Sequence, residues 1–209
     1  MSAETQTTAV PPLLVWFDSE FTTLELERAR LIQVAARVTR FDLQPMTSDG
    51  GGMVSPVRLP PGEEVSPWVS EQLGSLVAAA RSPDAPTLGD VESRLLALLD
   101  AAVAEAGPAD FVLAGNSIHT DWWLARRDFP RFMGRLHYRQ MDVTAFKLEW
   151  IVRGGGDPFD KTDPALVRQW FPAACAAGKQ GRHDAQYDIE ASIAELAFYR
   201  DRLLVPRGS

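Results

Sequence analysis

The chain has 209 residues, 45% apolar and 23% charged, a composition typical of one globular domain with short tails. Its 21 basic and 28 acidic side chains give a net charge of −7, which argues against a protein that tracks long nucleic acid by releasing many counterions. The single cysteine, Cys175, can form neither an internal disulfide nor a cysteine-based zinc site, so we expect a reducing, cytoplasmic location. No apolar run approaches the roughly 18 residues of a membrane span, and no membrane partner is expected.

The two ends are predicted to lie outside the folded domain. Residues 1–12 are small and polar and end in two prolines, which is typical of a flexible leader. Residues 204–209, LVPRGS, have the form of a thrombin cleavage sequence left by an expression vector. The folded domain is therefore predicted to span 13–203.

Strand-like segments dominate the first part of this domain. Residues 13–18 form an apolar run that is too short for a helix and is predicted to be a central strand. Residues 31–41 are rich in β-branched side chains and roughly alternate, and a glycine cluster separates them from a third candidate at 53–59. Three antiparallel strands are expected here.

Helices and short strands alternate in the remainder. The predicted helices are 66–80, a segment around 91–103 that ends at Gly107-Pro108, a helix from about 120, one at 144–153 and a long one at 183–202. Strands are predicted at 111–116 and 137–143, and a loop at 154–164. These elements predict an α/β fold in which a mixed five-stranded sheet is flanked by helices.

The first chemical signal is the sequence Asp18-Ser19-Glu20 at the end of the first predicted strand. Residues two apart on a strand point to one face, so two carboxylates lie side by side and repel each other unless a cation separates them. Taken alone, such a pair is more often a solvated strand end.

Two further acidic segments lie where they can meet this pair. Asp121 follows a buried strand at a helix start, where an acid can also serve the helix dipole alone. His183 and Asp188 lie near the start of the last helix, about one and a half turns apart, and can face one pocket. Each position has an ordinary surface interpretation, but their conjunction favours one shared site.

Three segments resemble motifs of a known family: WFDSEFTTLELERARLIQVA, AGNSIHTDWWLARRDFP and HDAQYDIEASIAELAFYR, with HYRQMDV between the last two. The chain from Leu13 to about Arg202 is similar to oligoribonucleases of the DEDDh 3'-5' exonuclease superfamily. That resemblance implies a ribonuclease H-like fold and a set of catalytic residues: Asp18, Glu20, Asp121 and Asp188 as metal-binding acids and His183 as general base.

The implied chemistry explains these residue types. Hydrolysis of a phosphodiester needs charge neutralisation at the attacking and leaving oxygens, which two divalent ions supply. Mg²⁺ and Mn²⁺ prefer hard oxygen ligands such as carboxylates. His183 would take the proton from the attacking water, because imidazole titrates near neutral pH.

The resemblance also implies a pocket for very short RNA. Leu24 would wedge against a base, and Trp68 is similar to a family tryptophan in the substrate region. Ser117, Arg139 and Thr144 would close around the 5' phosphate, and Tyr138 would reach in from the second subunit of a homodimer. The implied substrates are short oligoribonucleotides, dinucleotides above all, and no long duplex nucleic acid is expected as a partner.

The chain departs from the family pattern beside the acids. Ser19 stands where an apolar residue is usual, Phe21 where methionine is usual and Thr23 where glycine is usual; the segment after Trp68 is shorter, and Thr144 replaces the commoner serine. These changes leave the acids intact but alter the wall beside the substrate. Trp122 and Trp123 are candidates for base stacking, although core packing is the favoured interpretation.

The sequence therefore predicts a divalent-metal-dependent 3'-5' exoribonuclease that degrades short oligoribonucleotides to mononucleotides. One alternative is a DEDDh exonuclease that trims longer RNA or single-stranded DNA, which the net acidity disfavours. Another is a catalytically silent nucleotide-binding module, which the complete set of mutually repelling acids disfavours.

Overall fold

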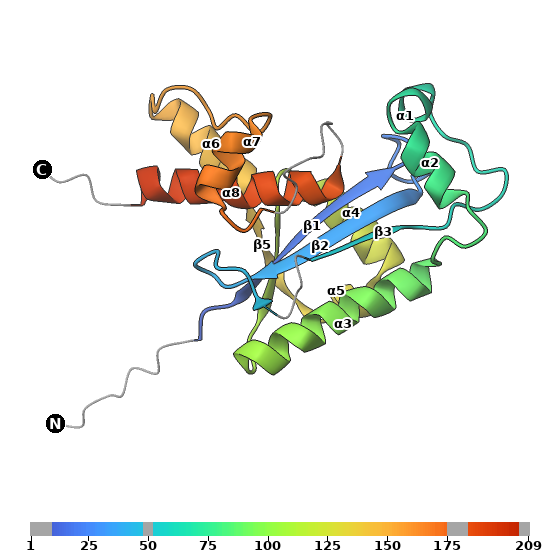
Figure 1. Ribbon diagram of the computed structural model, residues 1–209, viewed down its shortest axis with the longest axis horizontal. Coiled ribbons are helices and arrows are strands. Elements are labelled where there is room, and N and C mark those ends of the chain that lie inside the picture. The colour runs from blue at the N-terminus through green and yellow to red at the C-terminus, as the bar shows by residue number, and fades with distance from the viewer. Residues whose placement is uncertain (1–9, 48–51, 175–183, 205–209) are drawn as a thin grey trace, which may run out of the picture.

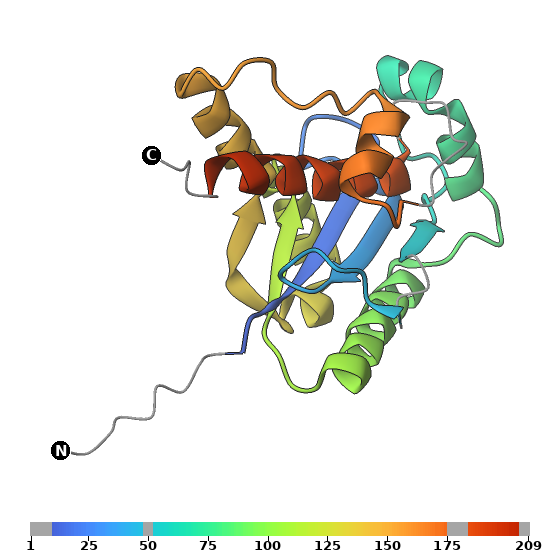
Figure 2. The same cartoon turned by 60° about the vertical axis from the view of Figure 1, so that its left-hand side comes forward.

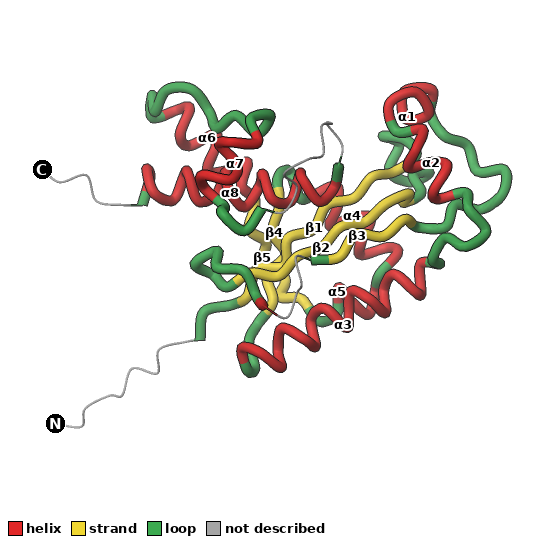
Figure 3. Tube along the Cα trace, in the orientation of Figure 1, coloured by secondary structure: helices red, strands yellow, loops and turns green. Residues whose placement is uncertain are grey.

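In the computed structural model, one mixed five-stranded sheet forms the centre of the molecule (Figures 1 and 3). The structure describes residues 10–47, 52–174 and 184–204. In the order of the sheet, the strands are β3 (Met53–Pro56), β2 (Leu31–Thr39), β1 (Leu13–Phe21), β4 (Phe111–Gly115) and β5 (Leu136–Asp142). The first three pair antiparallel, and β4 and β5 run parallel to β1. The predicted mixed sheet and the three antiparallel strands are confirmed.

Helices cover both faces of the sheet (Figures 1 and 2). The helices of one face are α3 (Leu88–Ala106), α4 (His119–Asp128) and α5 (Pro130–Met133). On the other face α8 (Ala185–Leu203) crosses the sheet, and α6 (Val143–Val152) and α7 (Pro164–Trp170) pack on α8. The short helices α1 (Pro67–Gln72) and α2 (Gly74–Ala80) pack near β2. None of the helices in the described ranges is long and apolar enough to cross a membrane.

Strand β1 is buried between the two helical layers. Its odd-numbered side chains from Leu13 to Phe17 join the core beneath α3, α4 and α5, whereas Leu14 and Trp16 join the core beneath α8. Burial on both faces explains why this strand is a continuous apolar run rather than an alternating one. The same alternation determines which face each later residue of β1 occupies.

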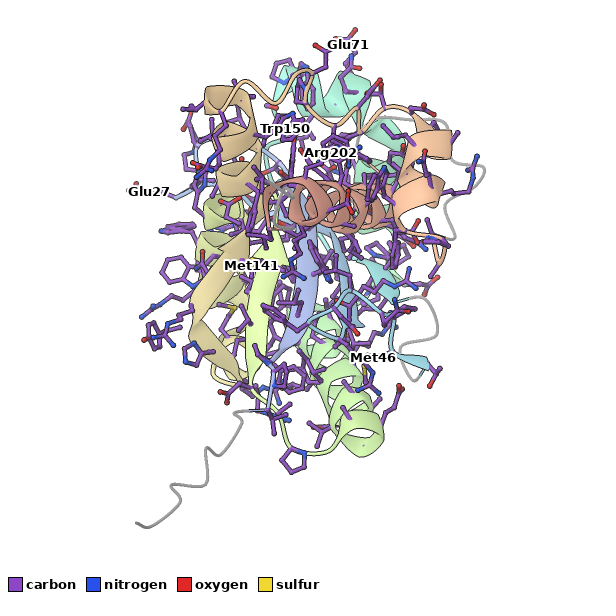
Figure 4. All side chains as sticks on the ribbon, turned by 90° about the vertical axis from the view of Figure 1, so that its left-hand side faces the viewer. Glu27, Met46, Glu71, Met141, Trp150 and Arg202 are labelled. Carbon is purple, nitrogen blue, oxygen red and sulfur yellow. The ribbon has the colours of Figure 1, made fainter. Side chains whose placement is uncertain are left out.

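Aromatic packing joins α6 to α8. Figure 4 shows Trp150 beside α8, and its ring lies 5.7 Å from that of Phe198 in an edge-to-face arrangement. The guanidinium of Arg202, labelled in the same view, lies 3.8 Å from the centre of the Phe198 ring. Such contacts are favourable beyond simple area burial and fix the position of α8.

The strands differ from prediction mainly at their ends. Strand β1 continues to Phe21, so that Asp18 and Glu20 lie inside it rather than at its end. Strand β3 ends at Pro56, before the predicted end at residue 59, and proline has no N–H to continue a ladder. The fifth strand begins at Leu136 and ends at Asp142, one residue earlier at each end than predicted.

Two helical predictions are corrected. The predicted helix 66–80 is the pair α1 and α2, because Leu73 leaves the helical conformation with φ of −119° and ψ of 24°. Helix α7 was not predicted, since its seven residues are too short for a clear periodic pattern. The helices predicted at 144–153 and 183–202 are confirmed as α6 and α8, and Gly107 ends α3 as expected. Residues 1–9 of the predicted leader and residues 205–209 lie outside the described part of the chain.

Candidate active site

Three carboxylates from β1 and α8 converge on one point. Asp18 and Glu20 share the face of β1 that looks toward α8, as their spacing predicts. Asp184 caps α8 by accepting hydrogen bonds from the N–H groups of Gln186 and Tyr187, which places Asp188 in the first helical turn. One carboxylate oxygen from each of Asp18, Glu20 and Asp188 lies within 4.8 Å of the others.

The pKa values of these carboxyl groups are raised because the groups are buried and lie close together. Burial is the largest cause that raises the pKa of Asp18 well above its ordinary value, and repulsion from Asp121 and Asp188 raises it further. Burial and the same two neighbours raise the pKa of Glu20 to about 7. A cluster that holds protons this tightly stabilises cations that replace them. Its hard oxygen donors suit Mg²⁺ or Mn²⁺, so these residues fit a divalent metal site.

Asp121 approaches from the other layer of the molecule. Its side chain is 8% exposed, and its Oδ1 accepts a hydrogen bond from the Ser19 hydroxyl at 2.6 Å. Burial raises the pKa of Asp121 to about 6, although the hydrogen bonds from Ser19 oppose that shift. Asp121 is outside the group of three close oxygens, yet it is near enough to repel Asp18 and Glu20.

A buried polar network ties the end of β4 to α8. The Asn116 amide donates to Ser192 Oγ and to Glu195 Oε2, each at 2.9 Å. Ser192 in turn donates to the backbone carbonyl of Asp188 at 2.7 Å. Tyr199 donates to the other oxygen of Glu195 at 3.2 Å. The network therefore fixes the turn of α8 that carries Asp188 relative to the sheet.

Ser117 and Thr144, which the family resemblance places at the 5' phosphate, lie side by side. The Ser117 N–H donates to Thr144 Oγ1 at 2.9 Å and to Asp142 Oδ1 at 3.0 Å, and the two hydroxyl oxygens are 3.2 Å apart. Ser117 has a φ of +49°, which is uncommon outside glycine and marks a constrained turn. The Thr144 hydroxyl also donates to Asn116 Oδ1 at 3.4 Å, which links the pair to the network beneath α8.

Leu24 and Trp68 line one apolar cavity beside Glu20. The cavity has a volume of about 550 Å³ and is lined by Glu20, Phe21, Thr23, Leu24, Ser66, Trp68, Val69 and Leu73. Leu24 is 89% exposed and Trp68 is 52% exposed, so both present large apolar surfaces to solvent. Exposure of this kind at a cavity mouth is typical of a surface that a ligand covers.

Other predicted site residues are not brought to the acids. Tyr138 and Arg139 lie on β5, with the guanidinium of Arg139 5.0 Å from the centre of the Tyr138 ring. Within the described ranges, no hydrogen bond or ion pair joins either side chain to Ser117, Thr144 or the acids. His183 and Cys175 lie outside the described residues. Trp122 and Trp123 are partly buried against the core of α3, α4 and α5, which confirms the packing interpretation.

Sequence reasoning missed two neighbours of the site. The charge of Lys161 acts on Asp18, and its backbone carbonyl accepts a hydrogen bond from the Tyr187 hydroxyl at 2.8 Å. No local pattern marks Lys161, because tertiary packing brings its loop to α8. Ser19 was treated only as a departure from the family pattern, although the alternation of β1 already places it on the face opposite Asp18.

Comparisons with known proteins show which family this chain resembles over most of its length. The family model described as Exonuclease matches residues 15–196. The chain is 35% identical to an oligoribonuclease of Streptomyces coelicolor over 93% of this chain and 88% of the relative. It is 30% identical to the mitochondrial oligoribonuclease of Mus musculus over 91% of this chain and 73% of the relative.

Solved structures share the fold at low identity. An exonuclease I of Methylocaldum szegediense superposes with a TM-score of 0.66 at 20% identity, covering 93% of this chain and 41% of that chain. A zinc-bound complex of E. coli exonuclease I with single-stranded DNA superposes with the same TM-score of 0.66 at 16% identity and covers 42% of that chain. This chain therefore spans less than half the length of those structures.

The mixed sheet with its two helical layers is a ribonuclease H-like fold, and its cluster of acids fits a divalent metal site. The match over most of the chain assigns it to the exonucleases. The chain belongs to the oligoribonuclease family, and the enzyme class that follows is a metal-dependent 3'-5' exoribonuclease, a hydrolase of phosphodiester bonds.

Proposed function

We propose that this enzyme hydrolyses short oligoribonucleotides, dinucleotides in particular, to nucleoside monophosphates with two divalent ions, Mg²⁺ or Mn²⁺. The observation that carries the proposal is the meeting of the Asp18, Glu20 and Asp188 carboxylates within 4.8 Å, beside a cavity that Glu20 shares with Leu24 and Trp68. A metal centre neutralises the charge of a phosphodiester, and apolar side chains beside it can stack on the attached base.

In this proposal the four acids bind the metal ions and His183 acts as the general base. Asp18, Glu20, Asp121 and Asp188 bind the two ions, which supply neutralisation of charge at the attacking and leaving oxygens. His183 accepts the proton of the attacking water, and its position just before the Asp184 cap of α8 puts it five residues from Asp188 in the sequence. The raised pKa values of Glu20 and Asp121 mean that protons compete with cations for both carboxylates as the pH falls.

The substrate is held between an apolar wedge and a polar cap. Leu24 and Trp68 contact the bases, and the paired hydroxyls of Ser117 and Thr144 bind the 5' phosphate. Arg139 completes the cap, because a guanidinium binds phosphate oxygens through two parallel hydrogen bonds.

A homodimer completes the site in this proposal. β5 is an edge strand of the sheet, and Tyr138 on it is 77% exposed. A symmetric dimer built on this edge would bring Tyr138 of one copy to the pocket of the other. The single cysteine supports a reducing compartment such as the cytoplasm as the place of action.

A second candidate, trimming of longer strands, has one observation in its favour. The apolar cavity adjoins a larger cavity of about 860 Å³, and Thr23 and Ser66 line both. Arg28 and Arg81 line the larger cavity and could meet further phosphates, although Arg28 is paired with Glu25 and Glu64. This pairing and the net charge of −7 favour the short substrate.

The proposal is tested by digesting a 5'-labelled pentaribonucleotide with Mn²⁺, with Mg²⁺ and with a chelator. We expect a ladder that shortens one nucleotide at a time from the 3' end with either metal and no products with the chelator. Asp188→Asn serves as the control, since it removes one ligand charge at nearly constant volume. Equal cleavage by this variant, or cleavage in the chelator, would contradict the proposed centre.

A further inference from the structure

Ser19 lies between Asp18 and Glu20 in the sequence but on the other face of β1. Asp18 and Glu20 face α8, and alternation along the strand turns Ser19 toward the layer that contains α4. Its side chain is 6% exposed, so the hydroxyl is buried and needs a hydrogen-bond partner. The environment of Ser19 is therefore determined by α4 and not by the three clustered acids.

The partner of the Ser19 hydroxyl is the carboxylate of Asp121. The two oxygens are 2.6 Å apart, a length typical of a hydroxyl donating to an ionised acceptor. This contact lies beyond the end of the parallel pairing between β1 and β4, whose last matched residues are Trp16 and Ala114. Among the described residues no strand pairs with β1 on this side past that point, and α4 contacts β1 there.

The hydrogen bond between Ser19 and Asp121 also joins β1 to the start of α4. The N-cap residue of α4 is Ile118, whose apolar side chain forms no capping hydrogen bond. Asp121 lies in the first turn of α4, so its bond to Ser19 ties that turn directly to β1. A carboxylate restrained in this way has fewer orientations to lose when it binds a cation.

We propose that Ser19 is a positioning residue that orients the Asp121 carboxylate toward the metal centre. The inference rests on the proposed function, because it presumes that Asp121 binds one of the ions. It accounts for a polar residue at a position where the family pattern has an apolar one. Removal of hydrogen-bond partners of metal ligands typically costs about 10- to 100-fold in metal affinity.

The test is Mn²⁺ binding measured by titration calorimetry, without substrate, for the full chain and three variants. Ser19→Ala removes the hydroxyl, and Ser19→Thr retains it. Ser55→Ala is the matched control, because Ser55 is a fully buried hydroxyl on β3 that bonds to Pro56 and Arg94 away from the acids. Circular dichroism establishes that each variant is folded.

We expect Ser19→Ala to weaken at least one Mn²⁺ site about tenfold or more, Ser19→Thr to retain most of the affinity and Ser55→Ala to change nothing. If both Ser19→Ala and Ser55→Ala bind Mn²⁺ as tightly as the unaltered chain, the inference is overturned and the metal site stands. A loss in Ser55→Ala as large as that in Ser19→Ala would also overturn it, since a general loss of stability would then explain both. Absence of Mn²⁺ binding in the unaltered chain would refute the proposed function and this inference together.

Discussion

Mutual repulsion among the acids costs the metal-free protein stability. Asp18, Glu20 and Asp188 lie within 4.8 Å of one another, and burial of the cluster weakens its screening by water. Each carboxylate is favourable only when a proton or a cation compensates it. Stability and activity are therefore opposed at these positions, as they often are at functional sites.

Asp18→Asn is predicted to raise the stability of the metal-free protein and to lower its activity. The change keeps the shape of the side chain and removes a charge that three neighbouring carboxylates oppose. In a chelator at pH 8, we expect the variant to have a higher midpoint of thermal unfolding than the unaltered protein. Its hydrolysis of RNA with Mn²⁺ should fall by orders of magnitude. A lower melting temperature together with full activity would show that Asp18 is not part of a repelling metal centre.

The pH dependence of metal-free stability follows from the same pKa shifts. Glu20 has a pKa of about 7 in the folded protein and an ordinary value of 4.5, so folding favours its protonated form. Its stabilising contribution is complete below about pH 4.5 and is lost as the pH rises through about 7. Asp121 acts in the same direction between 3.8 and about 6. Urea unfolding in a chelator between pH 4.5 and 8 measures the slope.

Glu20→Gln provides the comparison for this pH series. The variant lacks the titrating group, so its loss of unfolding free energy between pH 4.5 and 8 should be smaller than that of the unaltered chain. Mn²⁺ at pH 8 should stabilise the unaltered chain more than the variant, because a ligand that binds only the folded state raises its stability. Identical slopes in the two proteins would mean that Glu20 titrates normally.

Arg139→Ala tests the polar cap at the level of one side chain. If Arg139 binds the 5' phosphate of a short substrate, its removal should reduce kcat/KM for a dinucleotide by about tenfold or more, the usual loss for a hydrogen bond to a charged group. A strand of about twenty nucleotides should lose less. Arg135→Ala, an exposed arginine paired with Asp100 just before β5, is the control. Equal losses on both lengths would argue against a cap.

At the scale of elements, the site depends on how α8 is held against the end of β4. Asn116 bonds to both Ser192 and Glu195, and Glu195 is completely buried. Within the described ranges, the other side chains that bond or pair with Glu195 are the Tyr199 hydroxyl and the Lys147 ammonium, which is 4.0 Å away. Asn116 is therefore the main hydrogen-bond donor to one of the Glu195 oxygens.

Asn116→Ala is predicted to loosen this junction. Loss of the amide leaves a buried carboxylate with fewer donors, which typically costs about 1 to 3 kcal/mol of unfolding free energy. Urea unfolding measures that loss. Thr162→Ala removes an exposed hydroxyl that bonds to Asp160 and should change stability by less than about 0.5 kcal/mol. A loss in Asn116→Ala no larger than in Thr162→Ala would mean that the network does not hold α8.

Elements with a strong periodic or apolar signal were predictable from the sequence. The buried run of β1, the heptad-like apolar spacing of α3 and its glycine end all appear in the structure near the predicted positions. The break at Leu73 and the short helix α7 were not predictable in this way. Both depend on tertiary packing over a few residues, where propensity carries little information.

At the scale of the whole molecule, the site joins segments far apart in the chain. Alternation predicted that Asp18 and Glu20 share a face, but only the crossing of α8 over the sheet brings Asp188 to them (Figure 2). The alternation of β1 also does not predict that Asp121 approaches from the opposite layer, because that approach depends on where the pairing of β1 with β4 ends. The resemblance to a family identified the acids, and the fold explains their convergence.

The central claim is that this pocket selects very short RNA, and a length series tests it most directly. RNAs of two, five and about twenty nucleotides, with matched DNA, are hydrolysed with Mn²⁺, with Asp18→Asn as the inactive control. The account predicts the highest kcat/KM for the diribonucleotide, because the proposed wedge of Leu24 and Trp68 and the proposed cap of Ser117 and Thr144 would together hold only a very short strand. A higher kcat/KM for the longest strand would contradict a capped pocket and make the enzyme a trimmer of long 3' ends.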